Sequence, residues 1–287
     1  MEPTSEQRPS LKEKSPGEEH SGFELKPVID FYTLNAERIL ALLPLPNDSN
    51  LEYPIEQRQN IHLTPSDISS LLNLFPSSFK QRTELRNGGT FIGIPTTYFA
   101  RDSTPGDIRV TDKVEEALSP TAFATAYADS NTDENGIVSC HIGLAKLPDI
   151  IPTDVKKIIQ SHAIIHEGTH SITSHLLENE TLKIKLPSGE VISGKKCIER
   201  IALVAEKYRP MSHYTSGYRK ADQLFNDLPE SERTLAMEEE LCEMVAAHLL
   251  GFVFAEDDLQ RQFEPFKGRE DLVPLIEDFL KAEEIVE

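Results

Sequence analysis

The spacing of hydrophobic residues in the first half of the chain predicts two short helices followed by strands. Residues 31–43 repeat apolar positions with a helical period, and the segment ends before Pro44. A second helix should begin at Thr64, which can cap it, with Pro65 in its first turn, and end near residue 74. Segments 90–100, 121–128 and 137–144 are rich in β-branched and aromatic residues, and the last two flank a polar turn, which predicts an antiparallel hairpin.

The second half has the pattern of a mainly helical structure. No proline interrupts residues 153–177, and their apolar side chains recur along one face, which predicts a long helix. A small hairpin is expected at residues 181–193, because a Pro-Ser-Gly turn divides two short apolar runs. Further helices are expected at residues 197–208, 217–226, 230–254 and 272–284.

Residues 1–27 differ from the rest of the chain. They are rich in Glu, Lys, Ser and Pro, so they bury too little apolar surface to offset the entropy lost on ordering, and we expect a disordered tail. Residues 28–287 are expected to form a single domain, with a sheet-containing part at 28–150 and a mainly helical part at 151–287. The predicted fold class is α+β, with a small mixed or antiparallel sheet packed on the long helix.

The charge of the chain narrows the possible partners. There are 29 basic and 48 acidic residues, a formal net charge of −19. Nucleic-acid binding requires a cationic face, so we expect no nucleic-acid partner. The longest apolar stretch, residues 244–255, is too short to span a bilayer, and the N-terminal residues lack the apolar core of a signal peptide. The three cysteines are far apart and form no C-x-x-C pair, which favours a reducing compartment, so we expect a cytoplasmic protein.

The predicted long helix contains an H-E-x-x-H motif at residues 166–170. Residues four apart on a helix lie on one face, one turn from each other, so the His166 and His170 imidazoles can reach the same metal ion. Glu167 follows the first histidine and can take a proton from a water on the open side of that metal. His162 lies one turn earlier on the same face, and we expect it to be packed or hydrogen-bonded rather than a ligand.

A catalytic zinc site needs a third protein ligand and one open position. The metzincin pattern would place that ligand at position 176, which is Leu176, so that pattern is excluded. A downstream cluster of acidic residues offers the alternative: Glu238, Glu239, Glu240 and Glu243.

At these two segments the chain resembles the gluzincin class of H-E-x-x-H zinc metallopeptidases, which belong to the zincins. The resemblance implies a zincin-like fold and a Zn²⁺ ion held by His166, His170 and Glu239. It implies that Glu167 acts as the general base. It also implies that Glu243, four positions after Glu239, supports a ligand histidine from behind.

The choice among the glutamates stays open on the residues alone. At about 100° per residue, Glu238 falls on the apolar face of its helix, whereas Glu239, Glu240 and Glu243 fall toward the opposite side. A buried carboxylate needs a metal or a hydrogen-bond donor, so the periodicity favours Glu238. The spacing of the resembling class favours Glu239, which we take as the predicted ligand.

Two tyrosines lie between the two motif segments. The resemblance implies that a residue in this region stabilises the negatively charged oxygen of the reacting carbonyl, and Tyr214 and Tyr218 are the candidates.

The sequence therefore predicts a zinc-dependent metallopeptidase that hydrolyses peptide bonds of a protein or peptide substrate. Two alternatives remain: a catalytically inert zincin-like binding protein, and an acidic adaptor in which the motif is accidental. Glu167 argues against the inert protein, because loss of this base is the simplest route to an inactive relative. Stoichiometric zinc would argue against the adaptor.

Overall fold

A computed structural model describes residues 25–43, 62–76, 124–132, 138–144, 147, 149–178, 181–212, 214–252, 266 and 268–285 of the chain. The predicted strand at 90–100 and residues 1–24 of the predicted tail lie outside this set. Within the described residues the fold is mostly helical with a small antiparallel sheet, in line with the predicted mixture of helices and strands.

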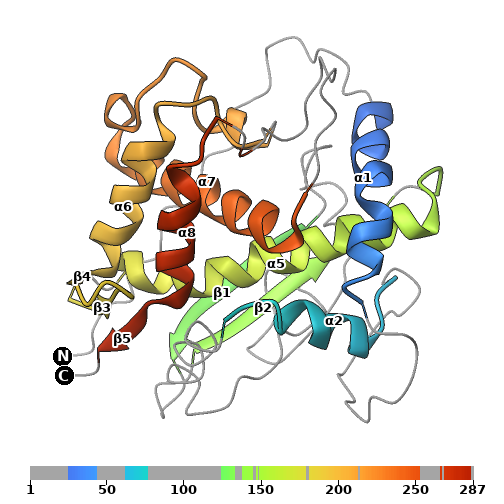
Figure 1. Ribbon diagram of the computed structural model, residues 1–287, viewed down its shortest axis with the longest axis horizontal. Helices are drawn as coiled ribbons and strands as arrows, with labels where there is room; N and C mark the ends of the chain where they lie inside the picture. Colours follow the sequence, from blue (N-terminus) through green and yellow to red (C-terminus); the bar gives the residue numbers. More distant parts are fainter. Residues whose placement is uncertain are drawn as a thin grey trace, which may run out of the picture.

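The long helix predicted around the motif is confirmed as α5, Thr153–Glu178. It begins directly after Pro152, whose carbonyl accepts a hydrogen bond from the Lys156 N–H at 2.9 Å. The apolar residues spaced along it, such as Ile158, Ile165 and Ile172, are at most 1 % exposed. Figure 1 shows α5 running through the middle of the molecule, and it contacts the hairpin and four other helices. The rest of the fold is therefore arranged around the helix that carries the motif.

Two helices before the sheet also match the expectations. The first, α1, spans Leu25–Leu40 and packs against α5. It begins before the predicted start at residue 31 and includes residues 25–27, which we expected to belong to the disordered tail. The second, α2, spans Pro65–Leu72. Its start is fixed by two reciprocal hydrogen bonds: the Asp67 N–H donates to Thr64 Oγ1 at 3.1 Å, and the Thr64 N–H donates to Asp67 Oδ2 at 2.7 Å.

The predicted hairpin is confirmed as β1, Ala124–Thr132, and β2, Val138–Leu144, but β1 continues four residues past its predicted end at residue 128, into the predicted turn. The two strands pair antiparallel, with Tyr127 opposite His141, and the register shifts between Ala128 and Thr132. Both strands contact α5. The expected packing of a small antiparallel sheet on the motif helix is therefore present.

A second, three-stranded sheet joins the two ends of the helical part. The predicted hairpin forms β3, Lys183–Lys185, and β4, Val191–Ser193. The predicted helix 272–284 is too long: α8 spans Leu272–Lys281 and is followed by a strand, β5, Glu283–Ile285. The open edge of β3 explains the difference, because β5 pairs with it and thereby satisfies backbone groups that a longer helix would leave unpaired.

Two further helices complete the C-terminal half. Helix α6 spans Gly194–Ala205 and is capped by Ser193, whose hydroxyl accepts from the Lys196 N–H. Helix α7 spans Glu230–Leu250 and ends at Gly251, which has φ of 61°. This left-handed conformation, which glycine adopts without strain, stops the helix before the predicted end at residue 254.

The predicted helix at 217–226 is wrong. The segment instead contains two single 3-10 turns, η2 at Thr215–Gly217 and η3 at Phe225–Asp227. The guanidinium of Arg219 is 1 % exposed and donates to the backbone carbonyls of Gln223 and Tyr208. These tertiary hydrogen bonds bind the segment into an irregular path that its own sequence pattern does not reveal.

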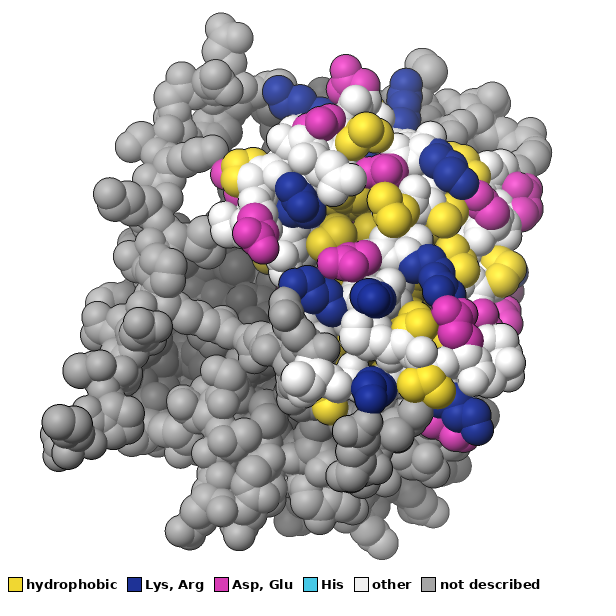
Figure 2. Space-filling view, turned by 90° about the vertical axis from the view of Figure 1, so that its left-hand side faces the viewer, with side chains coloured by type: hydrophobic (Ala, Val, Ile, Leu, Met, Phe, Trp, Pro, Cys, Tyr) yellow, Lys and Arg dark blue, Asp and Glu magenta, His cyan; other side chains and the backbone are white. Residues whose placement is uncertain are grey.

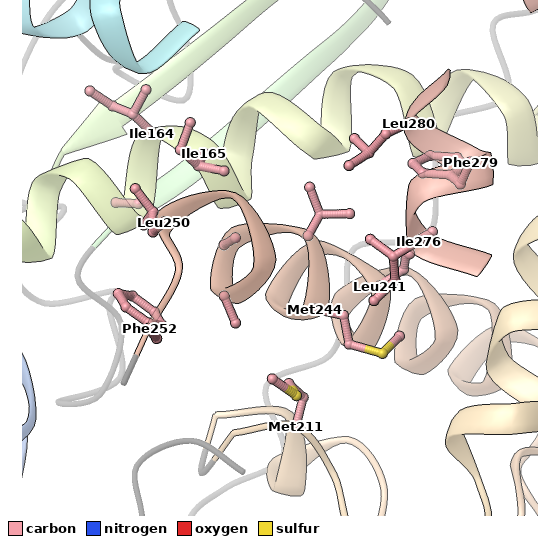
Figure 3. Close-up of a cluster of buried hydrophobic side chains, with 14 of the residues drawn as sticks. Ile164, Ile165, Met211, Leu241, Met244, Leu250, Phe252, Ile276, Phe279 and Leu280 are labelled. Carbon is pink, nitrogen blue, oxygen red and sulfur yellow. The ribbon is translucent and has the colours of Figure 1, made fainter. Parts of the chain in front are cut away.

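Part of the core lies around α7, between α5 and α8 (Figure 3), and the buried cluster continues into α1, α2 and α6. Each of its fully buried aliphatic or aromatic side chains contributes roughly 1.5–3 kcal/mol to folding. The labelled members are Ile164, Ile165, Met211, Leu241, Met244, Leu250, Phe252, Ile276, Phe279 and Leu280.

The face beside α6 is more mixed than the core. Figure 2 shows hydrophobic side chains near its centre with acidic and basic side chains around them. A pocket of about 240 Å³ lies there between α6 and the start of α7, and Leu203 at its rim is 53 % exposed. None of the described helices combines the length and the hydrophobicity needed to cross a membrane.

One close approach in the fold gives a test. A β-carbon added at Gly194 would lie 2.5 Å from Cδ2 and 2.8 Å from Cβ of Leu176. Gly194→Ala should therefore destabilise the protein by about 1–3 kcal/mol, measured by urea denaturation. At Gly217 an added β-carbon meets nothing within 4 Å, so Gly217→Ala is the matched control and should leave stability nearly unchanged. Equal stability of the two variants would contradict this packing.

Candidate metal centre

Helices α5 and α7 pack side by side and bring the motif and one glutamate together. His166 Nε2 and His170 Nε2 are 3.2 Å apart. Glu239 Oε2 lies 3.2 Å from the first of these nitrogens and 3.4 Å from the second. The three residues are between 5 and 8 % exposed. Three donor atoms from two helices thus converge on one small buried volume.

The spacing of these three atoms suits a tetrahedral metal ion. Ligand atoms bound to zinc at about 2.0–2.1 Å are about 3.3–3.4 Å from one another in a tetrahedron. The observed separations of 3.2, 3.2 and 3.4 Å therefore correspond to one face of such a tetrahedron. Two imidazole nitrogens and a carboxylate oxygen are also a donor set that zinc accepts in enzymes. The cluster of His166, His170 and Glu239 can bind a metal ion.

Glu238 does not lie where a third metal ligand would, although periodicity favoured it for that role. Its Oε1 accepts hydrogen bonds from His170 Nδ1 at 3.0 Å, Thr173 Oγ1 at 2.8 Å and Ser174 Oγ at 2.6 Å. The carboxylate is turned toward α5 and holds the His170 ring through its second nitrogen. Periodicity was wrong about the burial of this cluster, because Glu238 is only half-buried whereas Glu239, Glu240 and Glu243 are 2–7 % exposed. The partners of Glu238 are hydrogen-bond donors of α5 rather than the converging nitrogens.

Glu243 lies behind the other histidine. Its Oε2 is 2.9 Å from His162 Nε2 and 3.9 Å from His166 Nδ1, and its Oε1 accepts from Ser212 Oγ at 3.1 Å. Glu243, the predicted supporting residue, therefore lies on the expected side of His166. Its 3.9 Å distance to His166 Nδ1 is too long for a hydrogen bond. His162 is hydrogen-bonded, as expected for a residue that is not a ligand.

Glu240 belongs to neither group. It is 2 % exposed, its Oε1 accepts from the Met211 N–H at 2.8 Å and lies 3.7 Å from an Arg219 nitrogen. Burial raises the pKa of Glu240 to about 7, although Arg219 opposes the shift. This pair joins α7 to the segment that carries the two candidate tyrosines, and no pattern in the sequence indicates such a role.

The two tyrosines face the cluster from that segment. The hydroxyl groups of Tyr214 and Tyr218 are 2.9 Å apart, and the Tyr214 ring lies edge-on to the His166 ring with 5.9 Å between centroids. Burial and the nearby Glu239 carboxylate raise the pKa of both phenols. Both hydroxyls therefore stay protonated and can donate hydrogen bonds. Their side chains are half-buried, so they are less enclosed than the three converging residues.

The electrostatics of the cluster follow from burial and close opposite charges. Burial alone lowers the pKa of His166, but the hydrogen-bonded Glu239 carboxylate and the nearby negative charge of Glu243 raise it well above its usual value. Burial raises the pKa of Glu239, yet His170 and His166 outweigh this effect and lower it. Glu167 is 8 % exposed, and burial raises its pKa although the two motif histidines oppose the shift. A bound cation would replace the protons that these groups otherwise share.

Sequence reasoning missed several residues that support the cluster, among them Thr173, Ser174 and Ser212, which bond its glutamates, and Tyr32 of α1. The Tyr32 hydroxyl lies 3.0 Å from His162 Nδ1 although the two residues are 130 positions apart. Nothing in the helical pattern of residues 31–43 distinguishes this tyrosine from an ordinary core aromatic side chain.

Comparison with known proteins adds no relative to this picture. No protein-family model, curated protein or solved structure matches the chain. The interpretation of the site therefore depends on the geometry and chemistry of these residues.

The buried ion pair beside the cluster gives a second test. Glu240→Ala leaves the Arg219 guanidinium buried without its carboxylate, so we expect a loss of about 3–5 kcal/mol in the free energy of unfolding. Urea denaturation followed by circular dichroism measures this loss. Glu232→Ala, at an exposed position of α7, is the control and should change stability by less than about 1 kcal/mol. Similar stabilities for the two variants would show that the pair is not buried as described.

Proposed function

We propose that the protein is a zinc-dependent metallopeptidase with a zincin-like fold, acting on protein or peptide substrates. The observation that carries this proposal is the 3.2–3.4 Å spacing of the His166, His170 and Glu239 donor atoms. The general base that such an enzyme requires, Glu167, is adjacent to the first ligand in the same helix. The alternative glutamates have other partners, which supports Glu239 as the third ligand.

The donor set would hold Zn²⁺ with His166 Nε2, His170 Nε2 and Glu239 Oε2. When bound, zinc acts as a Lewis acid that polarises the scissile carbonyl and increases the acidity of water. Glu238 fixes the orientation of the His170 ring through its 3.0 Å hydrogen bond to Nδ1. In the proposed enzyme, Glu243 acts in the same way on His166 from the other side.

Glu167 moves the proton in the proposed reaction. Its carboxylate accepts a proton from the water that attacks the carbonyl carbon. As the C–N bond breaks, the same carboxyl group delivers that proton to the leaving amine nitrogen, so that the products are a free carboxylate and a free amine. Burial raises the pKa of Glu167 toward the range in which a carboxylate both accepts and releases a proton readily.

Tyr214 and Tyr218 supply hydrogen-bond donors beside the proposed zinc ligands. During attack, negative charge develops on the carbonyl oxygen, and a fixed donor there stabilises the transition state more than the substrate. The phenols remain protonated because their pKa values are raised, and their hydroxyls support one another at 2.9 Å. We propose that one of this pair donates to the developing oxyanion.

Metal analysis tests the donor set. The purified wild-type chain should contain one zinc per molecule, measured by inductively coupled plasma mass spectrometry. His166→Ala and Glu239→Ala should each lose it, because two remaining ligands bind zinc weakly. His248→Ala is the matched control, since this histidine packs against Phe266 with 6.2 Å between ring centroids and takes no part in the cluster. A wild-type chain without zinc would favour the acidic adaptor instead.

The general base gives a separate test of catalysis. Glu167→Ala should keep its zinc but lose peptidase activity by roughly 10²–10⁴-fold, the usual contribution of a general base. The measurement compares new protein termini generated in a proteome by the wild type and by Glu167→Ala, using mass spectrometry. Equal numbers of new termini, together with a variant that still performs the biological task, would support a zincin-like binding protein.

A further inference from the structure

A chain of hydrogen bonds leads from α1 to the back of the motif histidine. The Tyr32 hydroxyl lies 3.0 Å from His162 Nδ1, and His162 Nε2 lies 2.9 Å from Glu243 Oε2. The other oxygen of Glu243 accepts from Ser212 Oγ at 3.1 Å. The carboxylate of Glu243, a residue that is 2 % exposed, is therefore bonded to α5 and to the segment at Ser212, and is linked to α1 through His162.

The direction of these hydrogen bonds follows from the chemistry of the carboxylate. Glu243 Oε1 accepts from Ser212 Oγ, and Oε2 faces two imidazole nitrogens, so the carboxylate acts as an acceptor through both oxygens. His162 must then donate through Nε2–H, which leaves Nδ1 of the neutral ring as an acceptor for the Tyr32 hydroxyl. Burial raises the pKa of Tyr32, so this phenol keeps the proton that it donates.

The series of hydrogen bonds that starts at Tyr32 ends beside a nitrogen atom that lacks a hydrogen-bond partner in the described part of the chain. His166 Nδ1 is buried and has no hydrogen-bond partner among the described residues. Glu243 Oε2 is 3.9 Å away, about 1 Å beyond a normal hydrogen bond. A histidine that binds a metal through Nε2 carries its proton on Nδ1, and that N–H needs an acceptor. Glu243 is placed to be this acceptor, and His162 fixes where its oxygen lies.

We propose that Tyr32 and His162 are positioning residues of the metal centre, which hold Glu243 Oε2 at the Nδ1 side of the ligand His166. This inference rests on the proposed function, because it assumes that His166 binds zinc through Nε2. It assigns helix α1, which carries no ligand, a part in zinc affinity.

The surroundings of Tyr32 make this hydrogen bond hard to replace. Its side chain is 3 % exposed, and its ring packs edge-on against Phe31 and Phe252, with centroids 5.2 and 6.3 Å away. No bulk water takes the place of the hydroxyl if it is removed. The His162 ring then loses its fixed orientation, and with it the donor that directs the Glu243 carboxylate.

Zinc affinity of the full-length protein tests the proposal. The zinc Kd is measured by competition with a chromogenic chelator, with folding checked by circular dichroism. We expect Tyr32→Phe to weaken zinc binding about 10-fold and His162→Leu about 10- to 100-fold, the range for residues that support a ligand. His162→Gln should recover part of the loss, because its amide N–H can still donate to Glu243. Tyr208→Phe removes an exposed tyrosine–aspartate hydrogen bond elsewhere and should leave the Kd unchanged.

A double-mutant cycle separates positioning from a general loss of packing. If Tyr32 acts through His162, Tyr32→Phe in the His162→Leu background should change the zinc Kd by less than about twofold. Fully additive effects would overturn the proposal, as would folded Tyr32→Phe and His162→Leu proteins that bind zinc as tightly as the wild type.

The zinc measurements also distinguish failure of the positioning role from failure of the proposed function. His162, His166 and Glu243 together offer three donor atoms within 4.8 Å of one another. A second zinc in the wild type that His162→Leu removes would make His162 a ligand and overturn its positioning role. A wild-type chain that binds no zinc would overturn the proposed function as well, whereas tight wild-type binding with unaffected variants would overturn the positioning role alone.

Discussion

The contact between α5 and α7 is the interaction on which the centre of this protein depends. It places ionisable side chains in the interior, where an isolated charge is unstable because water no longer solvates it. Each imidazole of α5 that faces α7 meets a carboxylate, and each pair compensates the charge that burial would otherwise penalise. The same arrangement brings two nitrogens and one oxygen within 3.4 Å of one another, a cluster that can bind a metal ion.

The four glutamates clustered on α7 have four different sets of partners. Because successive residues of a helix point about 100° apart, neighbours in the sequence face different surroundings. Glu238 lies against Nδ1 of His170, whereas Glu239 lies against Nε2 of both motif histidines. Glu240 turns away toward Arg219, and Glu243, one turn later, meets His162. Four residues of the same type are distinguished only by the partners that the fold presents to them.

The residues around the α5–α7 contact differ in their exposure to solvent. The donor atoms and their supporting residues lie on α5 and α7, two long helices held by a shared core. The tyrosine pair lies on an irregular segment tied to α7 by the Glu240–Arg219 pair and is half-buried. In the proposed enzyme, this buried donor set beside half-buried hydroxyl groups is the arrangement expected for polarising a bound carbonyl.

Features that depend on local spacing were readable in the chain. The four-residue interval of His166 and His170 and the uninterrupted apolar stripe predicted a helix with two imidazoles on one face, and the polar turn between β1 and β2 predicted their pairing. Features that depend on distant partners were not readable. Residues 217–226 are not helical because the guanidinium of Arg219 binds backbone carbonyls, and β5 forms because β3 offers it an edge. Which glutamate meets the imidazoles, and that Tyr32 reaches His162 across 130 positions, follows from how α1 and α7 pack on α5. Helical periodicity sets only the direction of a side chain relative to its own helix, whereas its partner is set by the elements that pack beside it.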